Sequence, residues 1–159
     1  MATLAELLKD YEAGPGLLRQ AVAGLSPDQL RARPVEGRWS TLEVICHLAD
    51  FESILADRIK RILALDKPLL LGADEKLFAN RLAYHDRDPA EELAIVETTR
   101  RQLARILRTA PPDATQRIGV HSERGTLTLE QMLGGAARHL THHVKFIQEK
   151  RQALGLPAA

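Results

Sequence analysis

The chain has 159 residues, of which 45% are apolar and 27% charged, the size and composition of one globular domain with its own core. Its 22 basic and 21 acidic residues are interleaved and leave a net charge of +1, so we expect no nucleic-acid partner, which would require a clustered basic face. We expect one domain over residues 1–159. No apolar run approaches the roughly 20 residues that span a bilayer, so we expect no membrane segment. The single Cys46 and the lack of a secretion signal in residues 1–10 favour a location in the cytoplasm.

The first predicted helix covers residues 3–25. Thr3 and Glu6 have the spacing of a capping box, in which each side chain bonds the other residue's backbone N–H. The segment Gly14-Pro15-Gly16 is expected to kink or interrupt this helix, because proline lacks the N–H of the helical ladder. Ser26-Pro27 then predicts a short helical turn that ends before Pro34.

A second long helix is predicted over residues 40–64. Ser40 and Glu43 form a capping box, and Trp39 and Val44 are placed as a hydrophobic staple. Apolar residues then recur at spacings of four and three, which is typical of a helix with one buried face. Residues 65–73 are predicted to form a loop, and residues 77–84 another short helix.

The third and fourth long helices are predicted over residues 89–109 and 128–154. Asp88-Pro89 supplies an acidic cap and a proline at the first helical position. Thr128 and Gln131 form the capping box of the last helix. Between the two helices, residues 115–125 are predicted to be irregular, with room for a small hairpin.

Four long amphipathic helices predict an all-α fold, a four-helix bundle. The connection between the second and third long helices is too long for a tight antiparallel turn. We therefore expect a long crossover there, so that helices adjacent in sequence are not all antiparallel.

Three of the six histidines lie together on the last helix. At about 100° per residue, His143 falls inside the apolar stripe and His139 at its edge, whereas His142 points out of the core. His139 and His143 are one helical turn apart, and two imidazoles in that arrangement can converge on one metal ion.

A third ligand has to come from another helix, and His47 flanks the apolar stripe of the second long helix. Three neutral imidazoles with an open fourth position describe a catalytic type of zinc site. Nickel, cobalt and iron suit the same ligands. The sequence thus predicts one divalent ion per chain.

The remaining candidates have simpler interpretations. His85 and His121 lie in predicted loops and are expected to be solvated. Cys46 is expected to be a small packing residue, with redox reactivity as the alternative. Glu43 and Asp50 lie one turn either side of His47, where either carboxylate can orient an imidazole; for Glu43, capping of the helix is the preferred interpretation.

Two motifs resemble those of the DinB-like, or damage-inducible, family of metal-binding four-helix bundles. They are Gly37–Ser40 with Val44 and His47–Asp50, and Leu127–Glu130 with His139–His143. The order and separation of the motifs match, and the likeness covers nearly the whole chain. The resemblance implies that His47, His139 and His143 are the metal ligands. It also implies a homodimer, because such proteins are often dimeric.

The resemblance also implies an activity. Characterised relatives include metal-dependent transferases of low-molecular-weight thiols such as bacillithiol or mycothiol, and a thiol-dependent maleylpyruvate isomerase; others are named metal-dependent hydrolases. The stretch from Val144 to Gly155 looks most like the bacillithiol-transferase branch. Many relatives carry glutamine where this chain has Phe146, which implies a different substrate pocket.

Three functions follow from an open three-histidine site. A thiol bound to zinc or nickel ionises near neutral pH, and the thiolate attacks an electrophile, which makes the protein a transferase. If water is activated instead, the protein is a hydrolase. The third possibility is a metal-stabilised stress-response protein without catalysis. Arg138 and Lys145 are candidates for contact with an anionic thiol, or else simply exposed charges.

Overall fold

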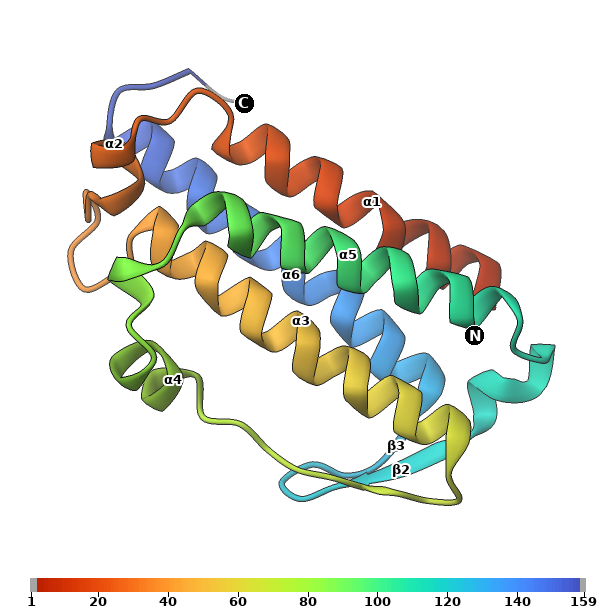
Figure 1. Ribbon diagram of the computed structural model, residues 1–159. Helices are drawn as coiled ribbons and strands as arrows, with labels where there is room; N and C mark the ends of the chain where they lie inside the picture. Colours follow the sequence, from red (N-terminus) through yellow and green to blue (C-terminus); the bar gives the residue numbers. More distant parts are fainter. Residues whose placement is uncertain (1–2, 158–159) are drawn as a thin grey trace.

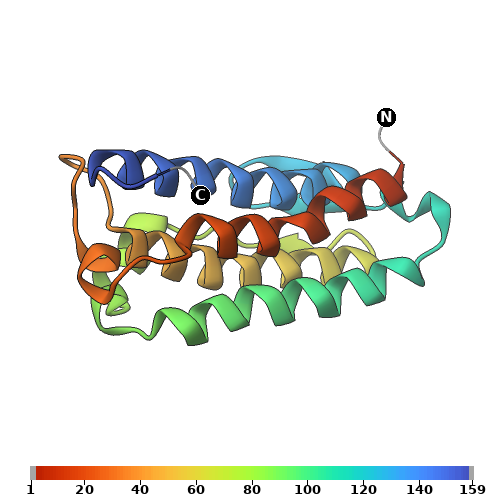
Figure 2. The ribbon, with the colours of Figure 1, turned by 90° about the horizontal axis from the view of Figure 1, so that it is seen from above.

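A computed structural model describes residues 3–157, so the ends of the predicted domain, residues 1–2 and 158–159, lie outside the described residues. Within residues 3–157, four long helices form a bundle: α1 (Leu4–Val22), α3 (Thr41–Ala64), α5 (Pro89–Arg108) and α6 (Leu129–Ala153) (Figures 1 and 2). The all-α four-helix-bundle class is confirmed. The four predicted helices correspond to these, although α1 ends at Val22 instead of residue 25.

The long helices begin where the capping residues predict. The Ser40 hydroxyl accepts a hydrogen bond from the Glu43 backbone N–H (3.1 Å), and the Glu43 carboxylate accepts one from the Ser40 N–H (2.6 Å). Reciprocal pairs of the same kind start α1 and α6. Each pair satisfies backbone donors that the first helical turn leaves free, which fixes the start of the helix.

The crossover between the second and third long helices is confirmed. In Figure 1, α3 and α5 run in the same direction, and α1 and α6 both run in the opposite one. The chain therefore returns along the whole bundle between Ala64 and Pro89. The return path contains β1 (Leu69–Leu70), α4 (Glu75–Arg81) and a 3-10 turn, η1 (Tyr84–Asp86).

A small sheet joins the two longest connections. Between α5 and α6 lie η2 (Pro112–Gln116), β2 (Ile118–His121) and β3 (Gly125–Thr128), and β2 pairs with β3 as an antiparallel hairpin. β1 pairs in parallel with β2, with Leu69 opposite Val120. The hairpin confirms the interpretation of residues 115–125, but the predicted loop at 65–73 includes β1. The predicted turn after Ser26 is α2 (Pro27–Arg31).

Helix α1 runs unbroken through Gly14-Pro15-Gly16, so of the predicted kink or interruption the interruption is excluded. Pro15 has no N–H for the Tyr11 carbonyl, and the Arg100 guanidinium of α5 donates to that carbonyl instead (2.7 Å). Because Gly14 has no side chain, Arg100 can approach this closely. A tertiary contact thus compensates for the bond that proline removes from the helix.

Arg100 connects all four long helices. Its guanidinium also donates to Glu52 of α3 (2.8 Å) and to the Ala136 carbonyl of α6 (2.8 Å), and Glu52 accepts a hydrogen bond from the Tyr11 hydroxyl. Arg100, Glu52 and Tyr11 are each at most 1% exposed. Apolar side chains surround this polar centre and form the core of the bundle. No described helix has both the length and the apolar character that would let it cross a membrane.

Candidate metal centre

The structure brings together the three histidines that the sequence singles out. His47 comes from the first half of α3, and His139 and His143 from successive turns of α6. One ring nitrogen from each lies within 4.8 Å of the others, and the Nε2 atoms of His47 and His139 are 3.0 Å apart. Two nitrogens on a tetrahedral zinc ion are separated by about 3.3 Å, so the spacing fits one ion.

Burial keeps the three imidazoles neutral, the form that binds metal. His47 is fully buried, and desolvation together with the neighbouring His143 and His139 lowers its pKa from 6.5 to about 2. Desolvation also lowers the pKa of His139 to about 4 and that of His143 to about 3. At neutral pH each ring therefore has a free lone pair, as a divalent ion requires.

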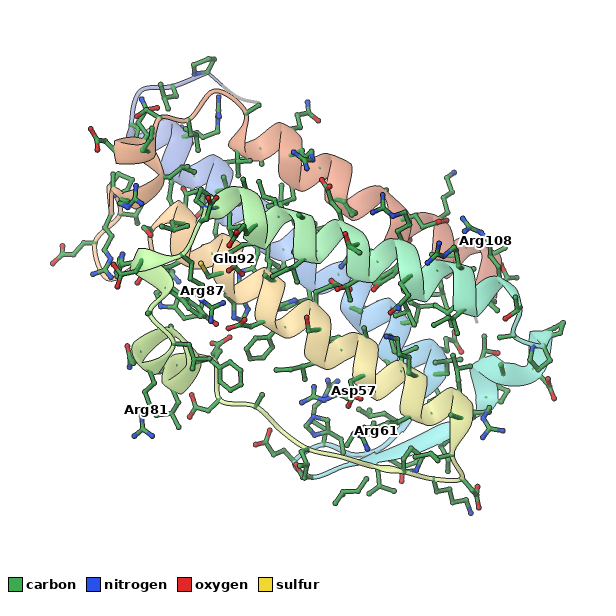
Figure 3. The ribbon with its side chains drawn as sticks, in the orientation of Figure 1. Asp57, Arg61, Arg81, Arg87, Glu92 and Arg108 are labelled. Atoms are coloured by element: carbon green, nitrogen blue, oxygen red, sulfur yellow. The ribbon has the colours of Figure 1, made fainter. Side chains whose placement is uncertain are left out.

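The Nδ1 atoms of the three rings have no hydrogen-bond partner among residues 3–157. Each of these atoms is buried. Glu43 caps α3 and pairs with Arg33 (2.7 Å), as its preferred interpretation requires, and Asp50 pairs with Arg87 (2.8 Å). Neither carboxylate forms a hydrogen bond or ion pair with His47, His139 or His143. Figure 3 labels Arg87 together with Glu92, to which the same guanidinium also donates (3.4 Å).

Aromatic rings hold the imidazoles in place. The His47 ring lies 5.1 Å from Trp39 and 4.4 Å from Phe51, between centroids. The Phe146 ring lies 5.5 Å from His143 and 4.6 Å from His142. These rings restrict the imidazoles by packing, in place of the hydrogen bonds that usually orient metal-binding histidines.

A carboxylate that the sequence analysis missed lies beside the three histidines. Glu75 is the first residue of α4, and its Oε2 is 4.0 Å from the Nε2 of His47. Asp74 caps α4 and starts it before the predicted residue 77. The capping residue Asp74 could have predicted this helix start from the sequence. The position of Glu75 beside His47 could not have been predicted in this way, because it depends on the path of the chain between α3 and α5.

A pocket of about 220 Å³ opens beside His143. Its wall is built from α4, α6, the first turn of α3 and the segment before α3. The lining residues are Val35, Gly37, Arg38, Trp39, Val44, Glu75, Lys76, His143, Phe146, Glu149 and Lys150. A small molecule in this pocket lies next to the His143 ring, so the three-histidine cluster can be reached by a ligand through His143.

The other candidates are distributed as follows. His142 is exposed, as predicted, and so is His85, which contacts Glu43 (2.9 Å). His121 is only 5% exposed, so its predicted solvation is wrong: its strand β2 lies between β1 and β3.

Cys46 is fully buried, which raises the pKa of its thiol to about 12 and supports the packing role. Arg138 and Lys145 are exposed and do not line the pocket.

Comparison with known proteins agrees with this geometry. "Putative metal-dependent hydrolase YfiT" of Bacillus subtilis is 29% identical over 145 residues, which cover 91% of this chain and 82% of that protein. A relative from Oceanobacillus iheyensis with the same type of name is 29% identical over 143 residues, covering 89% and 82%.

Two solved structures have the same architecture. That of YfiT, described as a probable metal-dependent hydrolase with an unusual four-helix bundle topology, superposes with a TM-score of 0.90 at 27% identity and covers 97% of this chain and 89% of its own. TT2238, a four-helix bundle protein, gives 0.65 at 28% identity, covering 92% and 99%. The family model of the DinB superfamily matches residues 10–147. The chain therefore belongs to the DinB superfamily.

Proposed function

We propose that this protein binds one divalent ion, zinc or nickel, through His47, His139 and His143, and that it is a hydrolase acting on a small molecule in the adjoining pocket. One observation carries the proposal: three neutral imidazoles converge on one point, His143 among them lines a pocket, and the carboxylate of Glu75, which lines the same pocket, lies 4.0 Å from His47. The names of the relatives point to the same class of reaction.

The residues of the site have separate tasks. A bound ion supplies Lewis acidity, which lowers the pKa of a water molecule and polarises a carbonyl group. The three ring nitrogens hold the ion, and Trp39 and Phe51 keep bulk water away from the fully buried His47. The Oε2 of Glu75 is placed to accept the proton that the attacking water loses.

Thiol transfer is the second candidate. Its support is the likeness of the stretch from Val144 to Gly155 to the bacillithiol-transferase branch. The same open position then receives a thiol, and Glu75 takes its proton. A purely structural ion is disfavoured, because among residues 3–157 no fourth histidine, cysteine or carboxylate joins the cluster.

One set of measurements tests the proposal. Metal analysis of the purified protein is expected to give one divalent ion per chain, lost in His47→Ala, His139→Ala and His143→Ala and retained in His142→Ala. The wild type is expected to cleave a nitrophenyl ester without added thiol, and thiol is expected to inhibit by occupying the ion. Conjugation of a thiol to chlorodinitrobenzene without ester cleavage would instead establish the transferase. Neither reaction in the metal-loaded protein would overturn both.

A further inference from the structure

Lys150 is an unusual lining residue of the pocket beside His143. It is 3% exposed, and its ammonium donates to the Phe146 carbonyl one helical turn earlier (3.1 Å). That bond uses one of its three N–H donors. Among residues 3–157, no carboxylate lies within 4.0 Å of its Nζ. A buried cation without an ion-pair partner is costly, which favours the arrival of an anion.

Arg38 approaches the same place from the segment before α3. Its guanidinium carbon is 5.8 Å from the centroid of the Phe146 ring, and the Nζ of Lys150 is 5.9 Å from it. Burial, the largest effect, lowers the pKa of Lys150; the charge of Glu149 raises it, that of Arg38 lowers it, and that of Glu43 raises it. Arg38 is exposed and, among the described residues, forms no ion pair within 4.0 Å. Two cations, neither of them in an ion pair among the described residues, thus lie near one aromatic ring.

Among residues 3–157, the acidic residues of the pocket form no ion pair within 4.0 Å with Lys150 or Arg38, although the charge of Glu149 raises the pKa of Lys150. Glu75 lies beside His47, and Glu149 is exposed. Lys76 adds a third cation to the wall, so the lining carries three cations and two carboxylates. This balance suits one negative charge better than two, because a dianion meets repulsion from both glutamates.

We propose that the pocket recognises a substrate with a carboxylate group, which Lys150 and Arg38 bind while the reacting bond lies over the three histidines. The volume of about 220 Å³ is below the roughly 300–1,000 Å³ of pockets for drug-sized ligands, so the substrate is a small monocarboxylate. This inference deepens the proposed function and rests on it for the reaction, although the carboxylate site itself is defined by Lys150 and Arg38 alone.

The single tryptophan of the chain, Trp39, lines the same pocket and reports on its occupancy by fluorescence. The experiment titrates the zinc-loaded protein with phenylacetate and with phenylacetamide, which differ only in the charged group. Phenylacetate is expected to bind more tightly by roughly tenfold or more, as for a charge-assisted pair. The preference is expected to survive chelation of the zinc, which excludes the metal as the anchor.

Variants assign the effect to the two cations. Lys150→Met is expected to abolish the preference and Lys150→Arg to keep most of it. The matched control Lys145→Met, exposed on the same helix and outside the pocket, leaves it unchanged. Should Lys150→Met fold poorly, Arg38→Met gives the same test from an exposed position. An unchanged preference in both variants, equal binding of acid and amide, or tighter binding of inorganic phosphate than of phenylacetate overturns the inference.

Turnover separates this inference from the proposed function. A half-ester of a dicarboxylic acid is expected to be cleaved with a higher kcat/KM than a neutral ester of equal length, and the advantage is expected to vanish in Lys150→Met. Ester cleavage that shows no such advantage overturns the carboxylate site and leaves the hydrolase. A preference for phenylacetate that depends on Lys150, without any ester cleavage, leaves the carboxylate site and overturns the hydrolase.

Discussion

At the scale of single residues, burial is what prepares the site for a metal ion. His47, His139 and His143 are neutral because desolvation opposes their charged forms, and they are close together because α3 and α6 are packed side by side. In the metal-free protein the Nε2 atoms of His47 and His139 lie at hydrogen-bond distance, so that one neutral ring donates to the other. An ion replaces this bond and the solvation that the buried nitrogens lack.

The lowered pKa values predict how the stability of the metal-free protein depends on pH. The unfolded chain protonates these histidines near pH 6.5, whereas the folded chain keeps them neutral down to pKa values of about 4 for His139, 3 for His143 and 2 for His47. Between pH 6.5 and the lowered pKa values, the unfolded chain binds more protons than the folded chain. The free energy of unfolding therefore falls as the pH decreases below about 7. The loss is at most about 1.4 kcal/mol per pH unit for each histidine.

Urea unfolding at several pH values checks this expectation. His143→Ala should show a shallower dependence than the wild type, because one buried histidine is gone. His142→Ala should follow the wild type, because its side chain is exposed. Identical slopes for all three proteins would contradict the assignment of neutral buried imidazoles.

Glu75 provides a second prediction at this scale. Glu75→Gln keeps the shape of the side chain but cannot accept a proton. The ester-cleaving kcat is expected to fall by about 10²–10⁴, the usual contribution of a general base. Metal content should stay at the wild-type level, since the histidines are intact. The exposed Glu36→Gln serves as the control; an equal loss in both variants would show that Glu75 has no special role.

The site was predictable from the sequence only in part. Spacing on a helix places His139 and His143 on one face and His142 off it, and both placements agree with the structure. Glu75 and Lys150 carry no such local signal. Glu75 reaches the site through the return path of the crossover, and Lys150 is set apart from other lysines only by its burial within the folded protein.

At the scale of the helices, too, features set by local sequence could be predicted and features set by contacts distant in sequence could not. Helix starts follow from local chemistry, and Ser40 and Thr128 cap α3 and α6 as expected. The behaviour of Pro15 and the pairing of β1 depend on partners distant in sequence, namely Arg100 and β2. Local patterns therefore predicted the elements but not the contacts that modify them.

The two glycines around Pro15 predict opposite effects of the same substitution. A Cβ at Gly14 would overlap the Arg100 guanidinium and come within 3.2 Å of the Leu140 Cδ1, whereas a Cβ at Gly16 meets nothing within 4 Å. Gly14→Ala is expected to destabilise the protein by about 1–3 kcal/mol through overpacking. Gly16→Ala is expected to stabilise it by about 0.5–1 kcal/mol through helix propensity. Chemical denaturation of the two variants checks both signs; the same sign for both would contradict the close approach of Arg100.

At the scale of the whole molecule, one buried guanidinium connects the four helices. Arg100→Met is expected to lower the free energy of unfolding by about 3–5 kcal/mol, because the buried Glu52 loses its ion-pair partner. The exposed Arg101→Met should change it by less than about 0.5 kcal/mol. Adding Glu52→Gln to Arg100→Met should recover part of the loss. Equal unfolding curves for the Arg100 and Arg101 variants would show that the network contributes little.

Helix α4 differs from the four helices of the bundle in having no buried residue, although it supplies Glu75 and Lys76 to the pocket. The buried side chains of Leu70 and Tyr84 secure the chain on either side of it. Segments with little buried surface open at a low free-energy cost while the rest of the protein stays folded. Hydrogen exchange of the α4 amides should therefore be much faster than that of α3. The rate at which product leaves and the next substrate enters would then be set by the opening of α4 between these two fixed points, independently of the chemical step.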